Sequence, residues 1–553
     1  MIVNNKLQII DYHKKIFHSK MNELRSTTSE ITNKVYKYHW VILGVIGTAG
    51  ILVRLYYFPF ELPITHDAQH FFWYAIDMTL LGNIPPGYNF PNTGWPSFLS
   101  VFFSLSNSNY ILDYMSIQRY LTVIISVATI FPVYLLCRKF VSIPYSLIGG
   151  MLFVFSPRLI LDSFEGGTIT PFFCLGAISL CLFLSDKKRF VYTSFVIAAL
   201  FAIVRYEGLL LIIPLLIMFF IRFRKEKSVI PKMCILLIIF VLILLPVAYM
   251  HSEATKNIQG YLITGKGHDS FLSHGIIQPT LYLQNTVNNE GFSELSSMLS
   301  KGAYNLVQYF GWVMLPLFIF FVPAGFLFAL KERDYKKTTI ILFIICFLIP
   351  AFYAYSRGIQ DTKYLYVLYP IFSILSILTI YKIQNKLKKP ILIGLAVIVL
   401  ILTGSIGFVH EKSNLEHDYE SLEIAKEISD IANGVNKYYP ESKYLIFLPL
   451  LNNDEFPVTV NKDIKERGIK QFEVDKHNSL EEFIQAERNN ELTHIVVDGN
   501  KSRISFLKEI FYDEKIPQYL KKELDTLELG FNYHVKVYKI NYKIFDSVIE
   551  KKI

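Results

Sequence analysis

Residues 229–250 have the sequence VIPKMCILLIIFVLILLPVAYM, a run of 22 residues that carries a single charge, Lys232. A helix needs about 20 apolar residues to cross the hydrocarbon core of a bilayer, so this run is long enough to span one. A strongly basic segment, RFRKEK at 222–227, comes directly before it. An apolar span beside a basic loop is typical of an integral membrane protein, and the pattern repeats along the chain.

The first three quarters of the sequence contain about eleven apolar windows bounded by charge. The 553-residue chain is 52% hydrophobic and only 18% charged, whereas soluble domains carry about 25% charged residues. This composition excludes a soluble enzyme, a disordered chain and a secreted disulfide scaffold, and it predicts a polytopic α-helical membrane protein. We expect spanning helices at 38–58, 117–137, 143–157, 170–185, 190–205, 208–221, 229–250, 306–330, 338–354, 364–381 and 390–409.

The distribution of charge predicts the orientation of these spans. Residues 1–409 have a net charge of +15, whereas residues 410–553 have −6. If the basic tail 1–37 is cytoplasmic, eleven spans place 18 cations in inner loops and eight in outer segments. The positive-inside rule then predicts a plasma-membrane protein with a cytoplasmic N-terminus and an extracytoplasmic C-terminus. The overall charge of +9 therefore reflects membrane topology and does not indicate nucleic-acid binding.

Two outer loops interrupt the predicted membrane domain 38–409. The first, 59–116, contains no Lys or Arg, and its apolar residues recur at helical spacing over 67–81. We expect juxtamembrane helices at 67–81 and 97–105. The second loop, 251–305, is rich in Gly, Asn and Ser, and we expect it to act as a lid.

The composition changes at about residue 410, beyond which there is no spanning run. Short apolar runs predict strands at 444–450, 493–498 and 533–540, and they alternate with helical patterns at 415–433 and 479–489. Residues 410–553 are therefore predicted to form an extracytoplasmic α/β domain. The five cysteines lie in or at the ends of predicted spans, which leaves no disulfide framework and fits a prokaryotic protein.

Ionisable residues gather where predicted spans end on the outer side. A charge beside lipid is costly and needs a reason. Cations can bind and stabilise a phosphate, and a carboxylate can accept a proton from a hydroxyl, so this set suits a reaction on a lipid phosphate. Its members are Asp67 in the first outer loop and, in three outer turns, Arg158, Asp162, Glu165, Arg205, Glu207, Arg357, Asp361, Lys363 and Tyr364.

Simpler interpretations compete with this one. Arg and Lys at helix ends often extend to lipid headgroups, and Asp67 is placed to cap a helix. His66, Asp67 and His70 could instead hold a divalent metal, because positions i and i+3 share a helix face. No fourth ligand can be named from the sequence, so the metal stays an open alternative and no cofactor is certain.

The order of these features resembles the GT-C superfamily of glycosyltransferases that use polyprenyl-phosphate sugars. The resemblance covers about residues 38–390, and such relatives include protein O-mannosyltransferases, the lipid A aminoarabinose transferase and archaeal dolichyl-phosphate-mannose transferases. The Trp-Trp-Asp motif of the oligosaccharyltransferase branch is absent from the sequence. The matching elements are Arg54 at the end of the first span, Asp67 with Ala75 and Met78, Gly94-Trp95-Pro96, Arg119, Arg205-Tyr206-Glu207-Gly208 and Lys363-Tyr364-Leu365.

The resemblance implies an inverting hexosyltransferase, with a mannose-like sugar carried on polyprenyl or dolichyl phosphate. The acceptor would be a protein, lipid or glycan of the cell envelope, and membrane lipids would surround the enzyme. Asp67 matches the family's catalytic base, and Glu165 is the expected second acid because Ala68 and Thr170 occupy the positions where relatives carry one. The expected donor-phosphate ligands are Arg205, Arg357 and Lys363, together with Arg158 and Tyr364.

Other classes of protein make different predictions. A ligase that moves a whole lipid-linked glycan would concentrate its catalytic residues in a late outer loop, so Asp67 would matter little. A secondary transporter would carry polar residues at mid-membrane and would have two related halves. A scaffold for the outer domain would leave the ordered charges at the span ends without a purpose.

Overall fold

The structure is a computed structural model that describes residues 33–65, 67–86, 88, 92–255, 290–332, 334–388, 390–413, 415–438, 442–445, 448–451 and 469–550. These residues form two compact units. The first comprises the described residues within 1–57, 86–95 and 121–412, and the second those within 58–85, 96–120 and 413–553. The first outer loop thus divides between the units, and most of it belongs with the C-terminal residues.

Apolar helices build the first unit. Within the described residues, seven helices are long and apolar enough to cross a membrane, or nine when two bent pairs each count as one span. Each of the eleven predicted ranges contains a helix, which confirms a polytopic helical membrane protein, whereas the number of crossings stays a prediction. The helices are Asn33–Tyr56, α4 (Ile111–Ala128), α5 (Ile130–Cys137), α6 (Ile143–Val154), α7 (Pro157–Glu165), α8 (Ile169–Phe183), α9 (Lys188–Val204), α10 (Ile212–Phe223), α11 (Val229–Thr255), α13 (Glu290–Met314), α14 (Val322–Lys331), α15 (Tyr335–Ser356), α16 (Tyr369–Leu387) and α17 (Pro390–Lys412).

Two of the predicted spans are not straight. The range 143–157 is divided into α6 and α7, whose axes differ by 48°, and the range 306–330 bends by 112° between α13 and the helix that ends at Lys331. Each break lies at a proline. Pro157 is the first residue of α7, and Pro316 follows the end of α13 at Met314. Proline has no N–H to donate and disfavours the helical conformation of the residue before it, so the apolar run continues while the helix does not.

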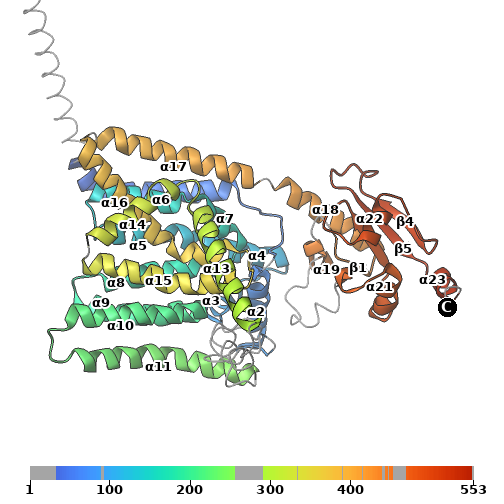
Figure 1. Cartoon of the computed structure of the whole chain (residues 1–553), viewed down its shortest axis with the longest axis horizontal. Coiled ribbons are helices and arrows are strands. Elements are labelled where there is room, and N and C mark those ends of the chain that lie inside the picture. The colour runs from blue at the N-terminus through green and yellow to red at the C-terminus, as the bar shows by residue number, and fades with distance from the viewer. Residues whose placement is uncertain are drawn as a thin grey trace, which may run out of the picture. The chain divides into compact units, whose positions relative to one another are not determined.

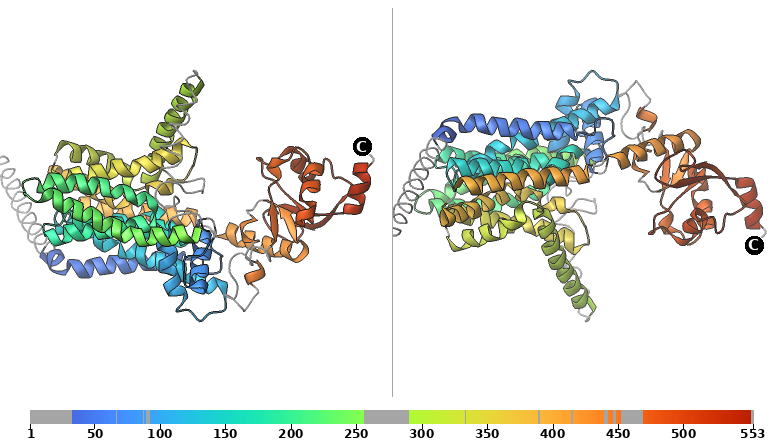
Figure 2. Two further views of the ribbon diagram at one scale, coloured as in Figure 1. Left: turned by 90° about the horizontal axis from the view of Figure 1, so that it is seen from below. Right: turned by 90° about the horizontal axis from the view of Figure 1, so that it is seen from above.

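Close helix packing positions the ends of the spans. Helices α8, α9, α10, α11 and α15 lie side by side in all three views (Figure 1 and Figure 2). Helix α14 approaches α16 so closely that a Cβ on Gly325 would lie 2.0 Å from the carbonyl oxygen of Leu375. Small residues commonly permit such close approach between helices in membranes. The interior of this unit is a continuous apolar cluster.

The second unit contains a five-stranded sheet in the order β2-β1-β3-β5-β4. Parallel pairing joins β1 to β2 and β3, whereas β5 pairs antiparallel with both β3 and β4. Alternate residues of β3 face different cores, with Ile495 and Val497 in one and Val496 in the other. The elements are α18 (Glu416–Ile431), β1 (Gly434–Asn436), β2 (Lys470–Phe472), α21 (Leu480–Glu487), β3 (His494–Asp498), α22 (Ser505–Phe511), β4 (Leu520–Asp525), β5 (Val535–Ile540) and α23 (Tyr542–Glu550).

The predictions for this domain were partly right. The two helices and the strands near 493–498 and 533–540 are confirmed, but the predicted strand at 444–450 is wrong. Its described residues form a 3₁₀ turn, Ser442–Tyr444, and a short helix, α19 (Leu448–Leu451). Pro449 has no N–H for a strand ladder, and a short apolar run does not distinguish a buried strand from a buried turn.

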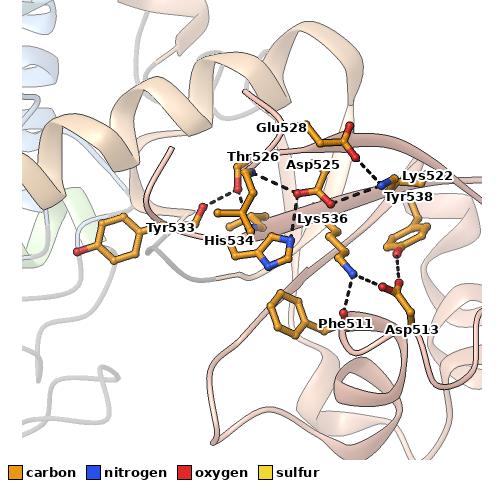
Figure 3. Close-up of polar contacts among 12 residues, drawn as sticks. Phe511, Asp513, Lys522, Asp525, Thr526, Glu528, Tyr533, His534, Lys536 and Tyr538 are labelled. Carbon is orange, nitrogen blue, oxygen red and sulfur yellow. Dashed lines mark hydrogen bonds and ion pairs between the residues drawn. The ribbon is translucent and has the colours of Figure 1, made fainter. Parts of the chain in front are cut away.

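Polar contacts close the β4–β5 hairpin (Figure 3). The Thr526 hydroxyl accepts a hydrogen bond from the Val535 N–H at 2.7 Å. The buried Lys536 ammonium donates to the Phe511 carbonyl at 2.8 Å and lies 2.6 Å from an Asp513 carboxylate oxygen. Because every charge that the sheet buries needs a partner, these contacts fix the hairpin against the loop after α22.

The predicted outer loop 59–116 contributes to the second unit. Helix α2 (Asp67–Leu81) confirms that the predicted range 67–81 is helical, and α3 (Gly94–Phe103) covers most of the predicted 97–105, whereas their position beside the membrane stays a prediction. Leu62 lies in the same apolar core as Leu422 of α18 and Val537 of β5. The loop that precedes Asp67 is therefore packed into the core of the C-terminal domain.

We expect the second unit to lose stability as the pH falls below about 6.5. Burial lowers the pKa of His494 from its usual 6.5, although the Glu523 carboxylate, 3.2 Å from Nε2, opposes this effect. The unfolded chain therefore binds a proton that the folded domain does not, and stability present above pH 6.5 is lost as the pH falls. Hydrogen-exchange protection factors of β3 and β5 in the full-length protein, compared between about pH 8 and pH 5.5, measure this loss.

The matched variants are His494→Gln, which should flatten the pH dependence, and His70→Gln, at an exposed position in the same unit, which should leave it unchanged. Equal pH dependence in wild type and His494→Gln would contradict the assignment.

Candidate functional site

Three turns at the ends of helices bring the predicted polar residues of the first unit together. They connect α7 to α8, α9 to the 3₁₀ helix η1 (Tyr206–Leu211), and α15 to the 3₁₀ helix η4 (Thr362–Leu368). Gly166 ends α7 with φ of 79°, a left-handed conformation that suits glycine. The carboxylate of Glu165, the last residue of α7, forms an ion pair with the Lys363 ammonium on η4. Two of the predicted residues, 198 positions apart in sequence, are thus in contact.

A buried carboxylate lies behind this ion pair. Asp162 is 5% exposed and accepts a hydrogen bond of 3.2 Å from the Thr170 hydroxyl. The Lys363 ammonium also attracts it electrostatically. The Asp361 side chain caps η4 by accepting a hydrogen bond from the Lys363 N–H at 2.8 Å. Lys363 is therefore surrounded by three carboxylates, which neutralise its charge.

The Arg205 guanidinium joins the first two turns. Its Nη2 lies 2.6 Å from Glu207 Oε1, and its Nη1 donates to the Thr168 hydroxyl at 3.1 Å. It also lies over the Phe172 ring, 5.8 Å from the centroid. A guanidinium offers five donors in one plane, so it can bridge several partners at the end of a helix.

The Gly94-Trp95-Pro96 motif has a structural counterpart in this unit. The Trp95 indole N–H donates to the Gly166 carbonyl at 3.0 Å, and Asn92 accepts a hydrogen bond from the Tyr206 N–H at 3.0 Å. A Cβ on Gly94 would lie 3.0 Å from the backbone of Ile203, so only glycine fits this approach easily. The segment 92–95 thus fastens the α7–α8 turn and the α9–η1 turn.

A pocket opens between η1, α15 and η4. Its polar and aromatic lining consists of Tyr206, Glu207, Tyr353, Arg357 and Tyr364, and its space, including the part open to solvent, is about 430 Å³. The remaining wall is apolar, from Pro350, Ala354 and Ile359. A concave site with apolar walls and a few convergent polar groups is the usual form of a ligand pocket.

Arg357 differs from the other predicted cations that line or border this pocket. It is exposed, and its Nη1 donates to the Tyr353 hydroxyl at 3.1 Å. Within the described ranges no carboxylate lies within ion-pairing distance of it, whereas Arg205 and Lys363 are both paired. A second cation lies near the same turn, because the Lys301 ammonium is 3.5 Å from the place where a Cβ on Gly358 would be. Among the described residues, the turn after α15 therefore offers an anion two cations, Arg357 and Lys301, that form no ion pair with a described carboxylate.

Asp67 belongs to the second unit and is the first residue of α2. Its side chain is exposed, and an acidic residue in the first turn interacts favourably with the helix dipole. The Gln118 amide donates to the Ala68 carbonyl at 3.1 Å, and the Arg119 guanidinium donates to the carbonyls of Pro59, Leu62 and Pro63. The first turn of α2 and the loop before it are thus held by α4.

Three arginines that the sequence analysis named, Arg54, Arg119 and Arg158, contact other groups. Arg54 is fully buried and donates to the carbonyls of Gly50 and Val154 and to the Ser126 hydroxyl, at 3.0 to 3.1 Å. Arg119 holds the loop described above. Arg158 lies over the Phe408 ring, 5.5 Å from the centroid, and does not line the pocket. The position of a cation along a predicted span does not show which carbonyls or rings it contacts in the folded chain.

The structure adds Lys301 to the residues near the site. Glu207, which the sequence analysis grouped with Arg205 among the charges at span ends, lines the pocket. Lys301 gave no local signal beyond its position before a span.

The metal and lid predictions remain predictions. Asp67 and His70 lie on α2 three residues apart and both are exposed, while His66 lies outside the described residues. In the described part of the chain, no group of three or more His, Cys, Asp or Glu side chains is arranged to hold a metal ion. Residues 256–289 of the proposed lid also lie outside the described ranges, whose helix α13 begins at Glu290.

Solved structures share the fold of this chain at low sequence identity. The oligosaccharyltransferase of Archaeoglobus fulgidus in its apo form is 12% identical, with a TM-score of 0.52 over 84% of this chain and 70% of that chain. Its complex with an inhibitory peptide and dolichol-phosphate, named AglB, has the same identity and coverage and a TM-score of 0.51.

ArnT from Cupriavidus metallidurans bound to undecaprenyl phosphate is 11% identical, with a TM-score of 0.51 over 91% of this chain and 98% of that chain. No protein-family model matches the chain, and no curated protein sequence matches it. These comparisons confirm the predicted GT-C fold.

We expect Arg119→Lys to loosen the loop 58–67. A lysine has one nitrogen at its tip and cannot contact three carbonyls in the geometry of a guanidinium, so about 2–3 kcal/mol of local stability should be lost. Hydrogen exchange of residues 58–67 in the purified protein measures this loss. Arg189→Lys, at an exposed cation, is the matched control. Unchanged protection in Arg119→Lys would show that the three carbonyl contacts do not hold the loop.

Proposed function

We propose that this protein is a membrane glycosyltransferase that moves a sugar from a polyprenyl or dolichyl phosphate to an acceptor at the outer membrane face. The observation that carries the proposal is a pocket, at the turns of a GT-C fold, in which Arg357 is exposed and not ion-paired with a described residue. The proteins of similar fold include one bound to undecaprenyl phosphate and one bound to dolichol-phosphate. The N-terminus would be cytoplasmic and the C-terminal domain, 410–553, extracytoplasmic.

Arg357 is the proposed anchor for the donor phosphate. When the sugar is transferred, the bond between the anomeric carbon and the phosphate oxygen breaks, and the lipid phosphate leaves with the electron pair. Hydrogen bonds from a cation to an oxyanion strengthen as that charge develops. Lys363 and Arg205 hold carboxylates in the structure, so they would support the site's shape and contribute to phosphate binding only after rearrangement.

Asp67 is the proposed general base. Its carboxylate would take the proton of the acceptor hydroxyl while the acceptor oxygen attacks the anomeric carbon from the face opposite the phosphate, which inverts the configuration. Its exposure supports this role, because an incoming hydroxyl can reach it. Glu165 is the second proposed acid, and its carboxylate forms an ion pair with Lys363.

A second candidate function is the transfer of a whole lipid-linked glycan. The similarity to an archaeal oligosaccharyltransferase favours it, although this chain covers 70% of that protein and 98% of ArnT.

The decisive experiment is a transfer assay with purified protein in lipid nanodiscs, with a panel of polyprenyl-phosphate monosaccharides and a lipid-linked oligosaccharide, each with and without chelator. Transfer from monosaccharide donors supports the main proposal, whereas flux of donor across liposomes without transfer would identify a transporter.

We expect Asp67→Asn to lower the turnover of sugar transfer by roughly 100-fold or more, because the amide cannot accept the acceptor's proton. Donor affinity should stay close to that of wild type. Glu61→Gln, at an exposed acid of the same loop, is the control and should transfer at the wild-type rate. Wild-type turnover in a folded Asp67→Asn protein would remove Asp67 from the base role.

We expect Arg357→Gln to raise the donor KM by roughly 10-fold or more, because the amide lacks the charge that binds the phosphate. Binding of sugar-free polyprenyl phosphate should weaken by a similar factor. Arg189→Gln, at an exposed cation of a predicted inner loop, serves as the control. If polyprenyl phosphate binds Arg357→Gln as tightly as wild type, the phosphate site lies elsewhere.

A further inference from the structure

Glu207 has one carboxylate oxygen whose partner is missing from the described residues. The side chain is 7% exposed, and its Oε1 is paired with Arg205 at 2.6 Å. Its Oε2 is fully buried and accepts no hydrogen bond from the described part of the chain. A buried polar atom without a partner is costly, so such an atom indicates a donor that arrives from outside the protein.

The surroundings of Glu207 indicate what that donor is. The residue lines the pocket beside the rings of Tyr206, Tyr353 and Tyr364, and Arg357 lines the same pocket. A carboxylate only accepts hydrogen bonds, so its partner must carry O–H or N–H groups. Aromatic walls, a carboxylate acceptor and an exposed cation together match a ligand that is a hydroxyl-bearing ring attached to an anion.

We propose that Glu207 recognises the donor sugar: its Oε2 accepts a hydrogen bond from a sugar hydroxyl while Arg357 holds the phosphate of the same donor. This inference rests on the proposed function and adds a class of substrate to it. The donor sugar is neutral, and sugars that carry a carboxylate, such as hexuronic acids, are rejected because a second anion beside Glu207 would be repelled.

Two contacts fix the position of the Glu207 carboxylate. Gly208, directly after Glu207, packs so tightly that a Cβ would lie 2.8 Å from the Ala202 Cα, and the Arg205 ion pair fixes the other side. The carboxylate is thus held in place before the ligand binds. A fixed acceptor of this kind discriminates strongly, because a ligand without the matching donor leaves it unpaired.

The experiment measures binding of three probes to the full-length protein in nanodiscs: polyprenyl phosphate alone, the same lipid phosphate carrying a neutral hexose, and one carrying a hexuronic acid. Wild type should bind the hexose probe at least roughly 10-fold more tightly than the hexuronic probe. Glu207→Gln keeps an acceptor oxygen but loses the charge, so the preference should largely disappear. Polyprenyl phosphate alone should bind Glu207→Gln at least as tightly as wild type, because the variant lacks the charge that repels a bare phosphate.

Two further variants make the result independent of folding defects. Glu207→Asp keeps the charge and retracts it, so it should still reject the hexuronic probe while it binds the hexose probe more weakly. Glu226→Gln, at a carboxylate that pairs with Lys188 and Lys232, is the matched control and should keep the wild-type preference. Arg357→Gln should weaken all three probes by a similar factor.

The outcomes separate this inference from the proposed function. If Glu207→Gln and Glu207→Asp both keep the full wild-type preference, Glu207 does not recognise the sugar, and the proposed transferase function stands. If wild type binds the hexose and hexuronic probes equally, the inference also fails. If wild type binds none of the three lipid phosphates, the proposed function itself is wrong.

Discussion

A charge at the edge of a membrane domain needs a partner, and the positions of the partners organise this structure. Arg54 is buried among carbonyls, Arg205 is paired with Glu207, and Lys363 is paired with Glu165. The Arg54 and Lys363 contacts connect helices or turns that are distant in sequence, whereas Glu207 stands two residues after Arg205. An unpaired charge near lipid is costly, so each of these contacts stabilises the arrangement. The same requirement makes the exceptions informative. Arg357 and the Oε2 atom of Glu207 lack such partners among the described residues, and both residues line one pocket.

The helical architecture could be predicted from the sequence because lipid permits few alternatives. Every backbone group in a span must be paired internally, so an apolar run of sufficient length is a helix. The bend within 306–330 escaped prediction, since the run stays apolar through Pro316 and hydropathy does not register a missing N–H. The failed strand at 444–450 has a similar origin, because apolar residues of a turn and of a strand fill the same core. In both ranges, the apolar composition did not distinguish between alternative backbone geometries.

The candidate site was less predictable than the fold because partner choice is a property of three dimensions. Arg119 and Arg357 both lie near the end of a predicted span, yet Arg119 contacts three carbonyls and Arg357 contacts a tyrosine hydroxyl. Their residue type and distance from a span are alike, and only the path of the loop 59–63 separates their roles. Glu207 was noticed as a charge and not as a site residue for the same reason. Its role in the site depends on the fact that Oε1 is paired and Oε2 is not, and a sequence pattern does not show which oxygen of a carboxylate is paired.

The opposite charges of Arg357 and Glu207 constrain the ligand more strongly than either does alone. A free phosphate or a bare lipid phosphate would satisfy the cation, but the nearby carboxylate would repel it. A neutral sugar would satisfy the carboxylate and leave the cation unpaired. A sugar joined to a phosphate presents an anion at one end and hydroxyl donors at the other, so it can satisfy both residues of the pocket at once. After transfer, the lipid phosphate remains beside Glu207 without the hydroxyls that balanced it. The same carboxylate that selects the donor therefore weakens the binding of the spent carrier, and this favours its release.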